Sequence, residues 1–230
     1  MSIFCNFLYF RDTLPIGLKG VPRLAQRVSL MIAVVDYGMG NIHSVTKATQ
    51  LAGAQVLVTD KPEEVLVADK VILPGVGAFC DGVEGLKQRN LTGAILESIK
   101  KGKYFLGICL GMQLLFEQSE ESKDARGLGI LNGKVKKFSI KGFKVPHIGW
   151  NQINPALNCK LLENIPQGAN VYFCHSYYVE PEEKSIIAAT TDYGEKFASV
   201  INQDNIFGVQ FHPEKSQSVG LKILKNFVEL

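Results

Sequence analysis

The feature of this sequence that most constrains its fold is a regular alternation of short apolar runs and helical stretches after Met31. Short apolar runs of this kind are typical of buried strands, which we expect at residues 32–36, 55–59, 70–74 and 104–108. Apolar residues at helical spacing follow Asn41, which can cap a helix, and recur over residues 82–101. Strands that alternate with helices form a parallel sheet covered on both faces.

The second half of the chain is richer in strands. We expect strands at 134–138, 171–175, 177–180, 186–191, 197–202 and 206–211, and then a closing helix from Ser216 or Gln217 to Val228. No repeat, low-complexity tract or linker interrupts residues 31–230. We therefore predict one α/β domain, with a central, mostly parallel sheet flanked by helices and an antiparallel strand-rich addition in the second half.

Residues 1–30 differ from the rest of the chain. They contain four Lys or Arg residues and one Asp, a formal charge of +3 that equals the charge of the whole chain. Three interpretations are open: a start codon placed upstream of a true start at Met31, a flexible or packed extension, and a targeting peptide. We treat residues 1–30 as an N-terminal extension and assign no chemistry to them.

Charge and composition exclude several classes of function. Residues 31–230 are formally neutral, which makes them a poor partner for a phosphate backbone, so we expect no nucleic-acid binding. No stretch approaches the roughly 18 consecutive apolar residues that cross a bilayer, so we expect no membrane partner and a cytoplasmic location. The five cysteines are too few for a disulfide scaffold, and neither they nor the four histidines show the paired spacing of a zinc site. We expect no metal and no cofactor.

The most informative local pattern is Gly107-Ile108-Cys109-Leu110-Gly111, between an expected strand and an expected helix at Met112–Glu117. It is the cysteine form of a nucleophile elbow, a sharp strand-to-helix turn in which the flanking glycines avoid steric clashes. Such a turn places the sulfur at the carboxyl edge of the sheet, where ligands bind in open α/β folds. The start of a helix also favours the reactive thiolate. Cys109 is therefore the candidate nucleophile, and a buried inert cysteine is the alternative.

A thiol nucleophile needs a base and a group that orients that base. Both occur in His212-Pro213-Glu214, directly after the strand expected at 206–211. Pro213 favours an extended backbone at His212, and residues two apart in an extended segment project to the same side. The Glu214 carboxylate can therefore reach the His212 ring and fix its tautomer while the other ring nitrogen faces Cys109. The alternative is a histidine at the end of a strand, beside a surface glutamate.

The remaining cysteines and histidines have simpler structural interpretations. Cys5, Cys80 and Cys159 lack flanking glycines at a strand-to-helix junction, and Cys174 is expected in the core because it lies in an apolar strand. The other histidines, His43, His147 and His175, are expected to have structural roles.

A tetrahedral intermediate needs hydrogen-bond donors for its oxyanion. The backbone N–H of Leu110, directly after the nucleophile, is one candidate. Pro74-Gly75-Val76-Gly77 is a glycine-rich turn at the end of an expected strand, and its backbone amides can turn toward a ligand. The alternative is a loop that only reverses the chain.

In this order, the motifs resemble those of the class I (triad) glutamine amidotransferases. Further segments resemble one branch of that family, the glutaminase subunits of imidazole glycerol phosphate synthase. These segments are Asp36–Asn41, Pro74–Phe79, Pro146–Asn151, His175–Tyr177 and Phe211–Ser216. The resemblance covers essentially residues 31–230; residues 1–30 depart from it, which supports the interpretation of a misplaced start.

The resemblance implies a role for each matching residue. Cys109 attacks the side-chain amide carbon of glutamine, His212 transfers the protons, and Glu214 holds His212. Backbone amides near Val76 and at Leu110 bind the oxyanion. The residues that contact the glutamine backbone are Gly77, Gln113, Ser176 and Tyr177. For Gln113 and Tyr177, the alternatives are an ordinary helix-face residue and a strand aromatic.

The resemblance also implies a heterodimer with a (β/α)₈-barrel cyclase subunit. That partner uses the ammonia to make imidazole glycerol phosphate and an aminoimidazole carboxamide ribotide. Free ammonia at neutral pH mostly becomes ammonium, which is no nucleophile, so a dry route between subunits is useful. Asn41, Trp150 and Lys215 match positions at or near the interface of such pairs, and core packing is the alternative for Trp150.

Two other functions stay open on the sequence. A paralogous amidotransferase subunit that supplies ammonia for amination of a surface-polysaccharide sugar would look nearly identical. Amidotransferases of the anthranilate and aminodeoxychorismate types are not expected to carry residues 146–151 as written here. The second open function is a non-catalytic subunit that only binds a partner, and the occupied Cys, His and Glu positions argue against it.

Overall fold

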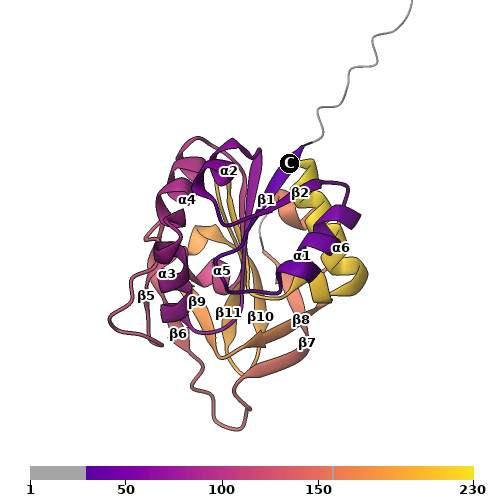
Figure 1. Ribbon diagram of the computed structural model, residues 1–230. Coiled ribbons are helices and arrows are strands. Elements are labelled where there is room, and N and C mark those ends of the chain that lie inside the picture. The colour runs from indigo at the N-terminus through magenta and orange to yellow at the C-terminus, as the bar shows by residue number, and fades with distance from the viewer. Residues whose placement is uncertain (1–29, 157) are drawn as a thin grey trace, which may run out of the picture.

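The computed structural model describes residues 30–156 and 158–230, so the N-terminal extension, apart from Leu30, lies outside the described residues. Within these residues, the strands form a nine-stranded sheet of order β2-β1-β3-β4-β12-β11-β10-β7-β8 and a three-stranded sheet of order β5-β6-β9. Helices lie on both faces of the large sheet (Figure 1). This is the α/β architecture predicted from the alternation of strands and helices.

The first half of the large sheet is parallel, and it carries the site. Its strands are β1 (Met31–Val35), β2 (Gln55–Thr59), β3 (Lys70–Gly75), β4 (Phe105–Cys109) and β12 (Ile206–Val209). β4 lies between β3 and β12 and is parallel to both. Every residue of β4 is buried, as expected for a parallel strand covered on both faces. Its carboxyl end therefore brings Cys109 to the edge of a rigid layer.

Helices cover the two faces of this parallel half. α1 (Ile42–Leu51) and α6 (Gln217–Glu229) pack together on one face. α2 (Pro62–Val67), α3 (Phe79–Gln88) and α4 (Leu91–Lys100) cover the other face (Figure 1). Asn41 caps α1 as predicted, since its side-chain oxygen accepts from the Ser44 N–H at 3.3 Å.

The single helix predicted over residues 82–101 is wrong. The segment forms α3 and α4, because the chain turns at Asn90, which has φ +56° in the left-handed region. Asn tolerates this conformation better than most residues do. The sequence pattern did not reveal the break because both helices keep an apolar face toward the same side of the sheet. The short helix α2 was also not predicted.

The second half of the large sheet is antiparallel, as predicted. Its strands are β7 (His147–Pro155), β8 (Ala169–His175), β10 (Ile187–Asp192) and β11 (Lys196–Gln203). The small sheet contains β5 (Phe116–Ser119), β6 (Leu131–Lys137) and β9 (Tyr177–Pro181). Single-turn 3₁₀ helices lie at Lys160–Leu162, Lys184–Ile186 and Pro213–Lys215. The sequence pattern missed β5 and β7, whose exposed polar residues interrupt the apolar alternation.

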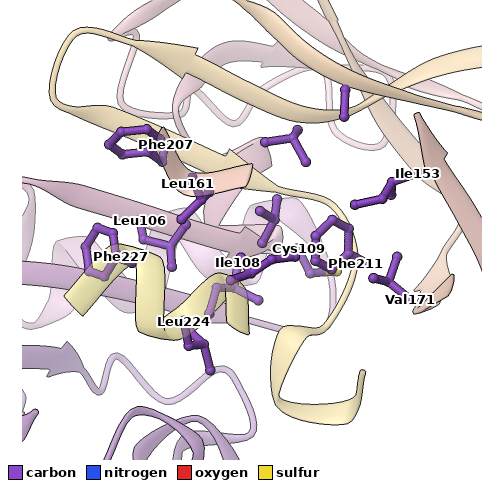
Figure 2. Packing of buried hydrophobic residues seen from close by; sticks show 14 of the residues in the cluster. Leu106, Ile108, Cys109, Ile153, Leu161, Val171, Phe207, Phe211, Leu224 and Phe227 are labelled. Carbon is purple, nitrogen blue, oxygen red and sulfur yellow. The ribbon is translucent and has the colours of Figure 1, made fainter. Parts of the chain in front are cut away.

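Two clusters of buried side chains fill the space on either side of the sheet. In the first, Leu106 and Ile108 of β4 pack toward Leu224 and Phe227 of α6 (Figure 2). The second fills the face under α3 and α4. Burial of a large apolar side chain contributes about 1.5–3 kcal/mol, so this packing holds the strand before Cys109 firmly. None of the helices in the described part of the chain is long and apolar enough to span a bilayer.

Candidate active site

Cys109 occupies the sharp turn that was predicted for a nucleophile elbow. Its backbone has φ +53° and ψ −108°, a conformation that costs energy for a residue with a side chain. A Cβ on Gly107 would lie 2.6 Å from the Gly111 carbonyl oxygen, and a Cβ on Gly111 would overlap the Leu73 carbonyl oxygen. The two flanking glycines are therefore required by close backbone approach, as expected from the motif.

The helix predicted at Met112–Glu117 is wrong. The helix after the nucleophile, α5, is a single turn from Leu110 to Gln113, and β5 follows it. The carbonyl of Leu114 accepts from Leu128 N at 2.8 Å, and that of Leu115 accepts from Ile130 N at 2.9 Å. These hydrogen bonds hold Leu114 and Leu115 against residues 128–130, and the chain then continues as strand β5 instead of as a helix. A helix of one turn has only a small dipole, so the effect expected from the start of a helix is weak here.

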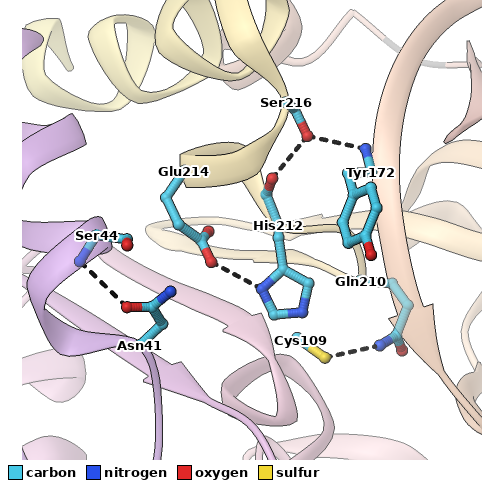
Figure 3. A network of polar contacts seen from close by, with 8 residues as sticks. All are labelled: Asn41, Ser44, Cys109, Tyr172, Gln210, His212, Glu214 and Ser216. Carbon is cyan, nitrogen blue, oxygen red and sulfur yellow. Dashed lines mark hydrogen bonds and ion pairs between the residues drawn. The ribbon is translucent and has the colours of Figure 1, made fainter. Parts of the chain in front are cut away.

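His212 and Glu214 form the pair that the sequence predicted. The backbone of His212 is extended, with φ −100° and ψ 96°, and His212 Nδ1 lies 2.9 Å from Glu214 Oε1. Their side chains are only 3% and 1% exposed, so little solvent weakens the interaction. A carboxylate only accepts, so Nδ1 carries a proton and Nε2 is left to face Cys109 (Figure 3).

The proton affinity of His212 is set by its two neighbours. Burial alone would lower the pKa of His212, but the charge and hydrogen bond of Cys109 and then those of Glu214 outweigh it and raise this pKa to about 10. His212 therefore holds a proton beside the sulfur at neutral pH. A cationic imidazole next to a cysteine stabilises the thiolate, which is the nucleophilic form.

A cavity of about 240 Å³ opens beside the sulfur. Every residue that was predicted to act on the substrate lines it, apart from Glu214, which lies behind His212. The predicted residues in its wall are Val76, Gly77, Cys109, Leu110, Gln113, Ser176, Tyr177 and His212. Residues from four separate parts of the chain therefore converge on one cavity at the carboxyl edge of the sheet.

The glycine-rich loop at the end of β3 lies directly beside the nucleophile. Gly75 pairs with Cys109 across the two parallel strands. A Cβ on Gly75 would lie 2.8 Å from the Leu110 Cβ, so only glycine lets the loop come this close. Gly77 has φ +102°, in the region that favours glycine. The loop backbone thus borders the place where an oxyanion on a substrate bound to Cys109 would form.

The cavity wall also includes residues that the sequence did not reveal. Glu121, Pro146, Cys174 and His175 line it, together with Lys215, which was predicted for the partner interface. Glu121 lies in a turn after β5, and its carboxylate accepts from the Phe79 N–H at 2.7 Å. No local motif marks Glu121, because only tertiary structure brings that turn to the site.

The prediction that Cys174 lies in the core is wrong. Residues of β8 alternate between the two faces of the sheet, and Cys174 is on the exposed face. Its two strand neighbours, Phe173 and His175, point inward and are buried. One face of an antiparallel strand can be solvated, so an apolar residue in such a strand is not necessarily part of the core.

The rings of His147 and His175 are buried and are joined in a chain of hydrogen bonds. Asn151 Nδ2 lies 3.3 Å from His147 Nε2, and His147 Nδ1 lies 3.1 Å from His175 Nε2. His175 Nδ1 lies 2.8 Å from the Tyr177 carbonyl oxygen, so it is the donor there. Burial lowers the pKa of His147 to about 4 and that of His175 to about 3. Both rings are neutral at physiological pH.

This pair predicts a loss of stability in acid. Between pH 6.5 and about 4, the unfolded chain binds protons that the folded pair rejects, so the free energy of unfolding falls as pH falls, by at most about 1.4 kcal/mol per pH unit for each histidine. We expect the melting temperature of a His147→Gln variant to fall less steeply over this range than that of the wild type. His43→Gln, at an exposed histidine, is the matched control and should follow the wild type. Parallel curves for His147→Gln and the wild type would contradict the expectation.

Two of the three predicted interface residues share an exposed surface near the cavity. Trp150 is 49% exposed, so core packing does not explain it. Its ring meets Tyr172 edge-on at 6.1 Å, and the Lys215 ammonium lies 5.8 Å from the centre of the same Tyr172 ring. Asn41, at the start of α1, lies near the Glu214 side of the site (Figure 3).

The described residues contain no group of three or more His, Cys, Asp or Glu side chains placed to hold a metal ion.

Comparison with known proteins identifies the family. Residues 33–230 match the glutamine amidotransferase class-I family. Among solved structures, PurLQS from Thermotoga maritima superimposes with a TM-score of 0.70 at 18% identity, covering 87% of this chain and 98% of that one. At this identity the likeness shows the fold alone. The chain belongs to the class-I glutamine amidotransferase family.

Curated relatives narrow the assignment within that family. The chain is 52% identical over 199 residues to imidazole glycerol phosphate synthase subunit HisH of Moorella thermoacetica, covering 86% of this chain and 94% of that protein. It is 51% identical over 195 residues to the subunit of the same name from Aquifex aeolicus, covering 84% and 94%. These relatives are subunits of imidazole glycerol phosphate synthase, the branch of the family that the sequence motifs resemble.

Proposed function

We propose that this protein is the glutaminase subunit of an imidazole glycerol phosphate synthase, with Cys109, His212 and Glu214 as its catalytic residues. The observation that carries the proposal is the placement of His212. One nitrogen of its ring meets Glu214 at 2.9 Å, the other faces the sulfur, and the sulfur lines a cavity. This is the arrangement that covalent catalysis by a thiol requires.

The reaction then proceeds in two halves. The Cys109 sulfur attacks the side-chain amide carbon of glutamine, and the carbonyl π electrons move to oxygen. His212 gives its proton to the leaving nitrogen, the C–N bond breaks, and ammonia and a thioester form. Water then attacks the thioester while His212 takes its proton, the C–S bond breaks, and glutamate leaves. Backbone N–H groups of Val76 and Leu110 are proposed to bind the oxyanion in both halves.

The cavity also suits the other end of glutamine, which carries an ammonium and a carboxylate. Gly77, Gln113, Ser176 and Tyr177 are proposed to contact this end. The Glu121 carboxylate lies in the same wall and offers an acceptor for the ammonium. Glutamine is therefore the small-molecule substrate that we assign to the site.

We further propose that the ammonia passes to a (β/α)₈-barrel cyclase subunit in a cytoplasmic heterodimer. That subunit would use the ammonia to make imidazole glycerol phosphate and an aminoimidazole carboxamide ribotide. The exposed Trp150, with Tyr172 and Lys215 beside it, supports a docking surface here, because aromatic side chains often anchor interfaces. Lys215 belongs to both this surface and the cavity, so the proposed partner would lie close to the reacting sulfur.

Reconstitution tests this function. Alone, the protein should hydrolyse glutamine slowly; with the barrel partner and the partner's nucleotide ligand, glutamate release should rise severalfold or more. Formation of imidazole glycerol phosphate from glutamine should appear only in the mixture. Equal glutaminase rates with and without the partner would contradict a coupled pair. Activation by a sugar-amidating synthase, but not by the cyclase, would instead favour the paralogous function.

Trp150→Ala tests the docking surface. We expect the affinity for the cyclase to fall about 10-fold or more, because the change removes a large apolar contact. Titration calorimetry on the two purified subunits measures this. The matched control is Phe143→Ala, another exposed aromatic, which lies outside the Trp150–Tyr172–Lys215 cluster. An unchanged dissociation constant for Trp150→Ala would place the interface elsewhere.

A further inference from the structure

Gln210 is a fully buried amide that makes contact with the nucleophile. Its side chain is 0% exposed, and its Nε2 lies 3.6 Å from Cys109 Sγ (Figure 3). Its Oε1 lies 3.3 Å from Gln113 Nε2. Both ends of this amide therefore make contacts inside the site, although the proposed reaction gives Gln210 no role.

The sheet places Gln210 beside the sulfur. β12 pairs in parallel with β4, and Val209 lies opposite Ile108, so the next residue of each strand is Gln210 and Cys109. The backbone N–H of Gln210 donates to the Ser199 carbonyl at 2.9 Å, which keeps this position in the sheet. Gln210 and His212 are two apart in an extended segment and project to the same side. The side chains of Gln210 and His212 therefore both reach the sulfur of Cys109.

The hydrogen-bond chain determines which end of the amide meets the sulfur. The Tyr177 carbonyl can only accept, so the Gln113 side chain must present its NH₂ group, at 3.1 Å. That NH₂ group in turn needs an acceptor from Gln210, which is Oε1. Gln210 Nε2 is then left to donate to Cys109 Sγ. The reverse orientation would set two NH₂ groups against each other.

We propose that Gln210 is a positioning residue that stabilises the Cys109 thiolate with one end of its amide and holds the substrate-binding residue Gln113 with the other. The inference rests on the proposed role of Cys109. A buried N–H donor favours the charged sulfur over the neutral thiol, and the second contact keeps Gln113 at a fixed distance from the nucleophile. The two residues that hold and attack glutamine are in this way linked through one side chain.

Gln210→Met tests the proposal, because methionine keeps the length and burial of the side chain but cannot donate. The rate of iodoacetamide labelling at Cys109 is measured against pH on the isolated protein by peptide mass spectrometry. We expect the labelling midpoint to move about one pH unit upward. The titratable groups around the sulfur and in the wall of its cavity (His212, Glu214, Tyr37, His175, Glu121, Tyr177 and Lys215) are left in place. Cys80, which is exposed and lies outside the cavity, should keep its wild-type profile.

The assay with the cyclase partner supplies the second readout. We expect Gln210→Met to lower kcat for glutamine about 10-fold and to raise KM, while ammonia-dependent synthesis is unchanged. Gln203→Met is the matched control, an exposed glutamine at the other end of the neighbouring strand β11, and should behave as wild type. Gln210→Glu keeps the shape of the side chain and replaces the donor with an acceptor, so its labelling midpoint should rise at least as far.

The labelling results distinguish a failure of the role proposed for Gln210 from a failure of the assignment of Cys109 as nucleophile. A folded Gln210→Met protein whose Cys109 labels with the wild-type profile would overturn the role of Gln210 and leave the proposed function intact. If Cys109 itself fails to label in the wild type, the nucleophile assignment fails first. Should neither variant fold, the side-chain amide resonance of Gln210 is followed in the wild type by NMR. It should titrate with Cys109 and lose that titration in Cys109→Ala; a resonance that does not titrate would overturn the inference.

Discussion

Cys109→Ala is expected to abolish glutamine-dependent synthesis by the complex while ammonia-dependent synthesis by the cyclase continues. The change removes the atom that forms the thioester, and no other cysteine in the described residues lies at a strand-to-helix turn beside His212. The loss should be on the order of 10³-fold or more, as for other covalent nucleophiles. Steady-state assays with glutamine and with ammonium salt, run on the same preparation, measure the two activities separately.

The control for this experiment is Cys80→Ala, at an exposed cysteine outside the cavity, which should keep full activity. Alanine keeps the Cβ of Cys109 and removes only the sulfur, so it adds no clash in the elbow and folding should be retained. Turnover of glutamine by Cys109→Ala above the background of the assay would show that the nucleophile is another group.

Glu214→Gln is expected to lower glutaminase kcat about 10²–10⁴-fold. The carboxylate accepts from His212 Nδ1 at 2.9 Å and helps to raise the pKa of His212. A neutral amide can present an NH₂ group to the ring, which favours the wrong tautomer, and it no longer stabilises the imidazolium. Because Glu214 lies behind His212 and does not line the cavity, KM for glutamine should change little.

The pH dependence of the Glu214→Gln variant gives a second check. Loss of the carboxylate lowers the pKa of His212 from its raised value of about 10, so the alkaline limb of the kcat profile should move to lower pH. Glu229→Gln, at an exposed carboxylate of α6, is the matched control. An unchanged kcat in Glu214→Gln would mean that His212 needs no orienting partner.

The local parts of this site could be predicted from the sequence. The elbow depends on the close approach of Gly107 and Gly111 to neighbouring backbone, and the His212–Glu214 contact depends on an extended backbone around Pro213. Both are short-range consequences of residue type. By contrast, the break at Asn90 and the end of α5 at Gln113 depend on where other segments lie, and these predictions were wrong.

Residue types and spacing along the chain were thus sufficient to determine the strand before Cys109, its turn, and the imidazole with its carboxylate, because each follows from the backbone conformation of a few adjacent residues. Tertiary structure alone decided that Glu121 enters the cavity wall, that Cys174 faces outward, and that Gln210 reaches the sulfur. The register between β4 and β12 and the packing of the turn after β5 set these positions. These contacts join residues that are 42 and 101 positions apart in the chain. They leave no periodic pattern in the sequence, because no local motif marks either residue of such a pair.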